Sequence, residues 1–189
     1  MTAVSTLHDV FIDELRDAYD AEKQLTRALP KLAKAATSPD LRTAFEKHLE
    51  ETRGHVTRLE HVFESIDETA RSKHCDGIAG IVEEGRSMIG EEVEATTRDA
   101  CLVAAGQRAE HYEIAAYGTL VAWARAMGHV EAADLLQQTL DEEKAADRKL
   151  TALAEDGINE DAAELAHTEE HAPQPARIRR TSLKTGGRR

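Results

Sequence analysis

The 189-residue chain has few of the residues that build sheets, disulfide frameworks or membrane spans. Aromatic residues make up only 4% of it, and its two cysteines, Cys75 and Cys101, do not form a CxxC pair. The scarcity of aromatic and β-branched residues argues against an all-β fold. Two isolated cysteines exclude a disulfide scaffold, a zinc ribbon and a rubredoxin-type iron site. No apolar run approaches the roughly 20 residues of a membrane span, and the acidic N-terminal segment is unlike a signal peptide, so we expect a cytoplasmic protein without membrane attachment.

What the chain does contain favours helices. Hydrophobic residues make up 41% of the sequence, and most of them are alanine and leucine, which are strong helix formers. The length suits a single domain with a sizeable core. The composition therefore predicts an all-α protein.

The charge is unevenly distributed along the chain. The formal net charge is -12, but residues 172–189 carry six basic residues and no acid, which leaves 18 basic against 36 acidic residues in the rest. An acidic body repels nucleic acid, so any contact with nucleic acid would belong to this basic segment. The segment also contains little apolar surface, and we expect a disordered tail with a solubilising or self-docking role.

Four long helices are predicted from apolar periodicity and from capping signals. Thr6 with Asp9 resembles a capping box, Ser38 followed by Pro39 is typical of a helix start, and Gly128 is typical of a helix end. The third helix is expected to begin at Thr97 or Asp99. The predicted helices cover residues 6–36, 38–67, 97–128 and 130–155.

A connection of roughly 30 residues separates the second and third long helices, and Asp76 is expected to cap a shorter helix over residues 77–94 within it. One long crossover is the arrangement of ferritin-like four-helix bundles, whereas an up-down bundle would have uniformly short loops. We therefore expect a ferritin-like bundle over residues 1–156, a short terminal helix or linker over 157–171, and the basic tail over 172–189.

Polar side chains interrupt the apolar seams of all four predicted helices. Residues that alternate at spacings of three and four point toward the core of a bundle. Two further acids, Glu51 and Glu110, lie within one turn of these positions. The polar seam positions are Glu22 in the first helix, His48, Thr52 and His55 in the second, Glu113 in the third, and Glu143 and Asp147 in the fourth.

These acids are also predicted to lie at one height along the bundle. Glu113 and Glu143 each lie 15 residues from Gly128, and antiparallel helices meet at equal distances from their shared turn. Glu22 lies 14 residues before Ala36 and Glu51 lies 12 after Pro39. At a rise of about 1.5 Å per residue, that offset of two residues is about 3 Å, which side chains absorb.

Several carboxylates buried at one height need compensation by protons, by basic residues or by cations. No lysine or arginine occupies these seam positions, so we expect two divalent metal ions. Carboxylate oxygens with one or two imidazoles favour iron or manganese over calcium. The alternative is a helix register shifted by one residue, which would turn the acids toward solvent or a wet interior.

Five segments resemble the YciE/YciF-type ferritin-like bacterial proteins, a group long labelled as a domain of unknown function. The most specific of them is AEHYEIAAYGTL (109–120). The resemblance spans residues 7 to about 154, and it implies a compact ferritin-like bundle with a candidate di-metal centre, often dimeric, in a family linked to stress responses. The other segments are DAYDAEKQL (17–25), HLEETRGHVTRLE (48–60), HCDGIAGIVEEG (74–85) and LDEEKAADRKL (140–150).

The resemblance also implies a set of metal ligands. Typical di-iron proteins carry Glu-x-x-His on two helices, but here Gly54 and Ala146 occupy the histidine positions. His48 or His55 on the second helix and Asp147 on the fourth would have to substitute. The implied carboxylate ligands are Glu22 on the first helix, Glu51 on the second, Glu110 and Glu113 on the third, and Glu143 on the fourth.

Two functional hypotheses follow from these residues. The first is a di-iron or di-manganese protein that reacts with oxygen or peroxide, in which Tyr19, Tyr112 or Tyr117 is either a radical sink, a hydrogen-bond donor or an ordinary core residue. The second is a non-catalytic, stress-associated structural or interaction bundle with a vestigial acidic seam. An iron-storage cage has less support, and the chain has no cysteine pair for an electron-delivery centre.

Overall fold

The computed structural model describes residues 6–90 and 92–170, and all the regular structure in these two ranges is helical, as predicted. A π-helical turn over Ala154–Ile158 joins the last two helices. The helices are α1 (Leu7–Ala35), α2 (Pro39–Ser65), α3 (Asp76–Gly90), α4 (Ala95–Met127), α5 (Val130–Leu153) and α6 (Asn159–Glu170).

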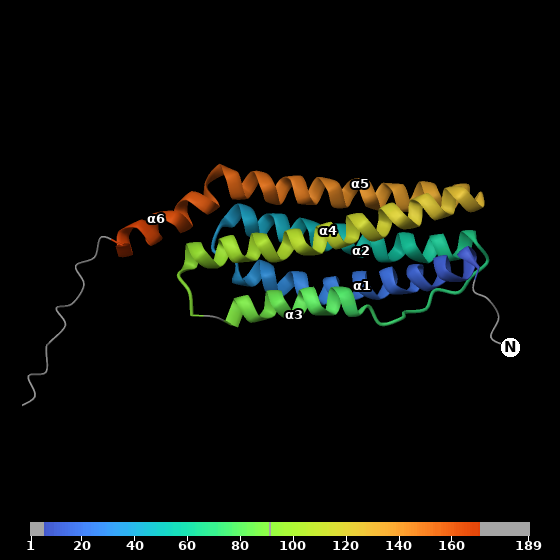
Figure 1. The fold of residues 1–189 in the computed structure, drawn as a ribbon, viewed down its shortest axis with the longest axis horizontal. Coiled ribbons are helices and arrows are strands. Elements are labelled where there is room, and N and C mark those ends of the chain that lie inside the picture. The colour runs from blue at the N-terminus through green and yellow to red at the C-terminus, as the bar shows by residue number, and fades with distance from the viewer. Residues whose placement is uncertain (1–5, 91, 171–189) are drawn as a thin grey trace, which may run out of the picture.

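The four long helices α1, α2, α4 and α5 run side by side (Figure 1). Each contacts two of the others in a ring, because α1 packs on α2 and α4, and α5 packs on α2 and α4. The shorter α3 lies in the connection between α2 and α4 and packs against α1 and α4. Within the described residues, no helix has the length and apolar character needed to cross a membrane.

Local sequence signals explain where α1 and α2 begin. The Thr6 hydroxyl accepts a hydrogen bond from the Asp9 amide, and the Asp9 carboxylate accepts one from the Thr6 amide, which confirms the capping box. The Ser38 hydroxyl accepts a hydrogen bond from the Leu41 amide, and Pro39 occupies the first helical position. Both helices therefore start where their backbone donors are satisfied.

The predicted start of the third long helix at Thr97 or Asp99 is wrong, because α4 begins at Ala95. Asp99 is buried one turn inside α4, and its carboxylate binds the turn between α1 and α2. It accepts hydrogen bonds from the amide and hydroxyl of Thr37, at 2.8 and 2.6 Å, and from the amide of Ser38 at 2.7 Å. The acid that resembled a local cap therefore satisfies a distant turn.

The predicted cap of the short crossover helix is also wrong by one residue. Asp76 is the first residue of α3, and the Cys75 sulfur accepts a hydrogen bond from the Ile78 amide at 3.4 Å. Gly128 ends α4 in the left-handed conformation with φ of 81°, as its position predicted. In the segment where the sequence left a short terminal helix or a linker open, the structure has α6, whereas the predicted tail over 172–189 lies outside the described residues.

The core consists of two apolar clusters at different heights along the bundle. The first includes Phe11, Leu15, Leu59, Leu120 and Leu136. Along every long helix, buried acids or histidines lie at or near the point where one cluster gives way to the other. A polar layer therefore separates the two apolar clusters. The second cluster includes Leu25, Leu29, Leu41, Phe45, Leu102 and Leu150.

Candidate metal centre

The polar layer contains six of the eight metal ligands that the sequence predicted. Each of the six side chains is almost completely buried, and together they come from all four long helices. Their exposed fractions are 1% for Glu22, 6% for His48, 0% for His55, 3% for Glu110, 2% for Glu113 and 0% for Glu143.

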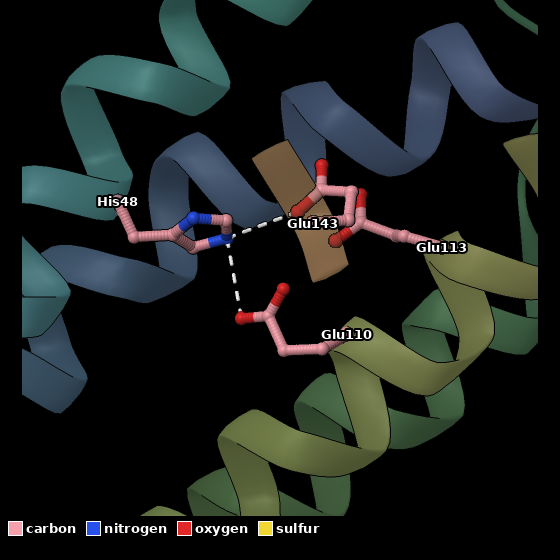
Figure 2. Close-up of side chains that lie close together, drawn as sticks. All are labelled: His48, Glu110, Glu113 and Glu143. Atoms are coloured by element: carbon pink, nitrogen blue, oxygen red, sulfur yellow. Dashed lines mark ion pairs between the residues drawn. The ribbon is translucent and has the colours of Figure 1, made fainter. Parts of the chain in front are cut away.

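These six residues form two groups that share one member. In the first group, His48, Glu110, Glu113 and Glu143 each offer one ligand atom, and these atoms all lie within 4.8 Å of one another. Figure 2 shows the four side chains pointing toward a common centre. The second group consists of Glu22, His55 and Glu143 under the same distance limit. Because Glu143 belongs to both groups, its carboxylate lies between two candidate cation positions.

The imidazole rings are the links between helices in this layer. Nε2 of His48 lies 3.3 Å from Oε1 of Glu110 and 3.8 Å from Oε2 of Glu143. Nδ1 of His55 lies 2.9 Å from Oε1 of Glu143 and 3.4 Å from Oε1 of Glu22. Each ring therefore presents one nitrogen to carboxylates from two other helices.

Most of the buried carboxylate oxygens have no hydrogen-bond donor within the described residues. Both oxygens of Glu113 lack one, as does one oxygen each of Glu22, Glu110 and Glu143, whereas Oε1 of Glu143 faces the His55 ring. Buried polar atoms in native proteins are normally satisfied, and a buried charge without a partner is strongly unfavourable. Oxygen ligands together with imidazole nitrogens suit iron or manganese ions, so the donor set fits the metals that the sequence predicted.

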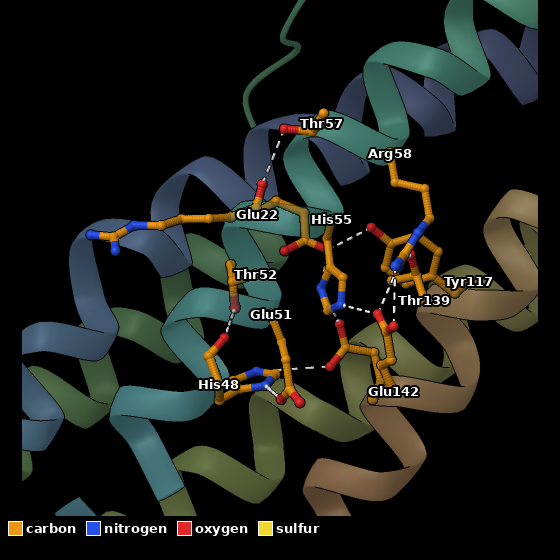
Figure 3. A network of polar contacts seen from close by, with 12 residues as sticks. Glu22, His48, Glu51, Thr52, His55, Thr57, Arg58, Tyr117, Thr139 and Glu142 are labelled. Carbon is orange, nitrogen blue, oxygen red and sulfur yellow. Dashed lines mark hydrogen bonds and ion pairs between the residues drawn. The ribbon is translucent and has the colours of Figure 1, made fainter. Parts of the chain in front are cut away.

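Glu142, an acid outside the two groups, fixes the orientation of His55. Oε2 of Glu142 lies 2.8 Å from Nε2 of His55 and accepts a hydrogen bond from Arg58 at 2.7 Å, and Arg58 also donates to the Thr139 hydroxyl (Figure 3). The imidazole is therefore held with Nδ1 facing Glu143. Metal-bound histidines commonly have such a carboxylate on the other ring nitrogen.

Glu142 and Arg58 were not predicted from the sequence. Arg58 lies three residues after His55 and Glu142 directly precedes Glu143, so helical spacing was the signal that could have found them. Arg58 approaches Glu142 and not the buried carboxylates of the two groups.

The carboxylates shift the pKa values of both histidines. Burial lowers the pKa of His48, but Glu110 and Glu51 outweigh burial and raise the pKa to about 9. Burial likewise opposes the protonated form of His55, and Glu143 is the main group that raises its pKa to about 11. Both rings thus favour the charged form unless another cation replaces the proton.

The pKa values of the buried carboxylic acids are raised, which favours their protonated forms. Burial raises the pKa of Glu22, and burial raises the pKa values of Glu110 and Glu113 well above the ordinary glutamate value. Neighbouring acids add to the rise, because like charges at close range disfavour ionisation. The layer therefore has two ways to balance its charge, by binding protons or by binding metal cations.

Two tyrosines form polar contacts that the sequence did not resolve. The buried Tyr117 hydroxyl donates a hydrogen bond to Oε1 of Glu22 at 2.5 Å. The Tyr112 hydroxyl donates to the Asp17 carboxylate at 3.1 Å and lies 3.0 Å from the sulfur of Cys75. Burial raises the pKa of the Cys75 thiol, which fits a packing and capping role. Of Tyr19, Tyr112 and Tyr117, only Tyr117 donates a hydrogen bond to a residue of the two groups.

The remaining two predicted ligands, Glu51 and Asp147, lie outside both groups. The Glu51 carboxylate is 30% exposed, and its oxygens lie 2.9 Å from Nζ of Lys47 and 3.7 Å from Nδ1 of His48. His48 and Lys47 lower the pKa of Glu51 to about 2. Asp147 lies 3.2 Å from Nε2 of the exposed His111. Glu51 therefore adjoins the first group, whereas the partly exposed Asp147 contacts His111 away from both groups.

The fold and the site describe an all-helical protein with a buried cluster of histidines and glutamates. The chain belongs to the family described as "Domain of unknown function (DUF892)", whose sequence pattern matches residues 6–163. It is similar to Protein YciF of Escherichia coli (strain K12), with 48% identity over 160 residues that cover 84% of this chain and 96% of the relative. This similarity confirms the YciE/YciF-type resemblance.

Solved structures support the same relationship. The crystal structure of the E. coli stress protein YciF has a TM-score of 0.80 and 48% identity, covering 82% of this chain and 99% of that one. YcfI from Rhodopseudomonas palustris has a TM-score of 0.77 and 42% identity, covering 79% and 96%. A protein from Xanthomonas campestris pv. campestris has a TM-score of 0.69 over 86% of this chain and 99% of that one, and at 22% identity it supports the fold alone.

Proposed function

We propose that this chain is a ferritin-like four-helix metalloprotein that binds two divalent transition ions, iron or manganese, and reacts with oxygen or peroxide in stress protection. The observation that carries the proposal is the position of Glu143. Its carboxylate belongs to both buried groups; Oε2 has no hydrogen-bond donor among the described residues, and Oε1 lies 2.9 Å from the His55 ring, a candidate ligand of the second group. A carboxylate shared by two metal ions satisfies both oxygens.

The proposed ligands divide between the two ions. His48, Glu110 and Glu113 would hold one ion, Glu22 and His55 would hold the other, and Glu143 would contact both. Four carboxylates balance the charge of two divalent cations, so the filled site would be neutral without protons on the histidines. Glu51 adjoins the first group and is proposed as a further ligand of the first ion, with its extra negative charge matched by Lys47 at 2.9 Å, whereas Asp147 is not part of this assignment.

Bound iron or manganese would supply electrons to oxygen or peroxide by changing oxidation state. The chain's own residues orient and protect the site. Glu142 and Arg58 hold the His55 ring, and the Tyr117 hydroxyl supports Glu22. The apolar clusters at the two ends of the polar layer reduce its contact with bulk water, which strengthens electrostatic interactions inside it.

The family relationship and the sequence support further proposals about the role, the location and the partners of the chain. The similar E. coli protein is described as a stress protein, which supports a role in stress protection for this chain. We further propose a cytoplasmic homodimer, with the bundle over residues 1–156, a terminal helix or linker over 157–171 and a basic tail over 172–189. The acidic body is expected to bind no nucleic acid, so the tail is the only candidate for such a contact.

Metal content measured after aerobic purification tests the proposal. We expect two transition ions per chain, and a loss of metal in Glu113→Ala. Glu131→Ala is the matched control, because Glu131 is an exposed acid in the first turn of α5. A folded chain that contains no metal and is indifferent to chelators would contradict the proposal and favour a non-catalytic structural bundle.

A further inference from the structure

A cavity of about 260 Å³ lies between α2 and α5 and reaches the buried His/Glu layer. Its inner end includes His48 and Glu110, which lie 3.3 Å apart and come from α2 and α4. Figure 2 shows these two side chains facing each other. The cavity therefore connects the first proposed ion position with the surface of the bundle.

The inner end of the cavity is lined by two buried polar side chains. Glu110 is only 3% exposed, and its Oε2 has no hydrogen-bond donor among the described residues. His48, at 6% exposure, lines the same end. A ligand that enters the cavity would thus meet a buried carboxylate and an imidazole after passing the cavity walls.

The walls of the cavity are apolar and its rim has no net formal charge. Small side chains leave the space, because Ala44 of α2 and Ala145 and Ala146 of α5 line the cavity, and Phe45 and Leu150 add apolar surface. The charged residues around the rim are two acids and two bases, which favours a neutral ligand over an ion. These rim residues are Asp40, Glu51, Lys47 and Lys149.

The size of the cavity exceeds what the smallest oxidants need. A water molecule has a share of about 30 Å³ in the liquid, and hydrogen peroxide or dioxygen has only two heavy atoms. A cavity of about 260 Å³ with apolar walls instead fits a small organic molecule with a hydrocarbon body.

We propose that this cavity binds a neutral organic hydroperoxide, with its hydrocarbon body against Phe45 and Leu150 and its oxygen atoms toward His48 and Glu110. The inference rests on the proposed function and names its substrate class. Reduction to the alcohol would break the O–O bond with two electrons, which two bound divalent ions would supply by going to the trivalent state, and with two protons from solvent. The products are the corresponding alcohol and water.

Binding is tested first, on the full chain without metal. The probe is 2-phenyl-2-propanol, the alcohol product of cumene hydroperoxide, and the readout is the NMR shifts of alanine methyl groups. We expect saturable shifts at Ala44, Ala145 and Ala146, and binding at least about tenfold weaker in Ala146→Phe, which fills the cavity. Ala44→Leu is a second filling variant, and Ala115→Phe on the exposed face of α4 is the control.

Reactivity is tested second, by stopped-flow oxidation of the metal-loaded chain with cumene hydroperoxide and with hydrogen peroxide. We expect the ratio of the two rates to favour cumene hydroperoxide in the native chain and to fall about tenfold in the filling variants. An alcohol that shifts no cavity alanine, or an unchanged rate ratio, would overturn the inference. A chain that takes up no metal but binds the alcohol in this cavity would refute the proposed function alone and leave a ligand site there.

Discussion

Nε2 of His55 lies 2.8 Å from Oε2 of Glu142, so the imidazole is held from the side away from the buried carboxylates. The same Glu142 carboxylate accepts two hydrogen bonds from Arg58, at 2.7 and 3.1 Å. The guanidinium lowers the pKa of Glu142 against the opposing effect of burial, which keeps this acid charged. The pair therefore presents the other ring nitrogen, Nδ1, to the interior in a fixed direction.

Removing this support is expected to weaken metal binding without removing a ligand. Glu142→Ala leaves the His55 ring free to rotate. Groups that hold the other ring nitrogen of a metal-bound histidine contribute about 10-fold to 100-fold in metal affinity. Competition with a calibrated chelator measures the change. The exposed neighbour Asp141 provides the control Asp141→Ala, which should retain native affinity. Equal affinities in both variants would show that Glu142 does not orient a ligand.

Metal binding is expected to release protons. The pKa values of about 9 for His48 and about 11 for His55 mean that both rings are protonated at pH 7 in the metal-free chain. Coordination requires the neutral ring, so at least two protons per chain should leave when both ions bind. Calorimetric titrations in buffers of different ionisation enthalpy measure this number. Binding heats that are independent of the buffer would contradict the assignment of the histidines as ligands.

The stability of the metal-free chain is expected to fall as the pH rises from 6.5 to 9. Both histidines bind protons more tightly in the folded chain than at their ordinary pKa of 6.5. Their contribution is therefore complete below about pH 6.5 and is lost as the pH rises through the folded-state values, by up to about 1.4 kcal/mol per pH unit for each proton. Urea unfolding at several pH values tests the sign. A free energy of unfolding that increases over this range would be inconsistent with the buried contacts of these rings.

Two glycines of α3 are expected to respond oppositely to alanine. A Cβ at Gly77 would lie 2.6 Å from Cε2 of Tyr112, whose hydroxyl is tied to Asp17 and Cys75, whereas Gly80 has no neighbour within 4 Å. Gly77→Ala should destabilise by about 1–3 kcal/mol through overpacking. Gly80→Ala should stabilise by up to about 1 kcal/mol through helix propensity. Thermal unfolding of both variants checks the contrast, and similar shifts would refute the close packing of α3 on α4.

Much of the helical framework was predictable because its signals are local. Thr6, Ser38 and Gly128 act within one turn of their own helices, and the structure places helix ends at all three. The convergence of the buried glutamates was also predictable, because helical spacing and equal distances from a turn determine height along a bundle. Asp99 was misassigned because its partners, Thr37 and Ser38, lie about 60 positions away in the sequence.

The details of the site depended on contacts that spacing does not encode. Glu51 and Asp147 have helical positions close to those of the buried residues. Glu51 nevertheless contacts Lys47, and Asp147 contacts His111, outside the two groups. A rotation of a few tens of degrees about the helix axis separates a buried position from a flanking one. Likewise, the Arg58 contact with Glu142 depends on how closely α2 and α5 approach.

Anomalous diffraction at the iron and manganese edges, from crystals grown without added metal, tests the central claim most directly. The account predicts two peaks, one among His48, Glu110 and Glu113 and the other beside Glu22 and His55, with Glu143 adjacent to both. Well-ordered glutamates at these positions with no anomalous peak at either edge would contradict it.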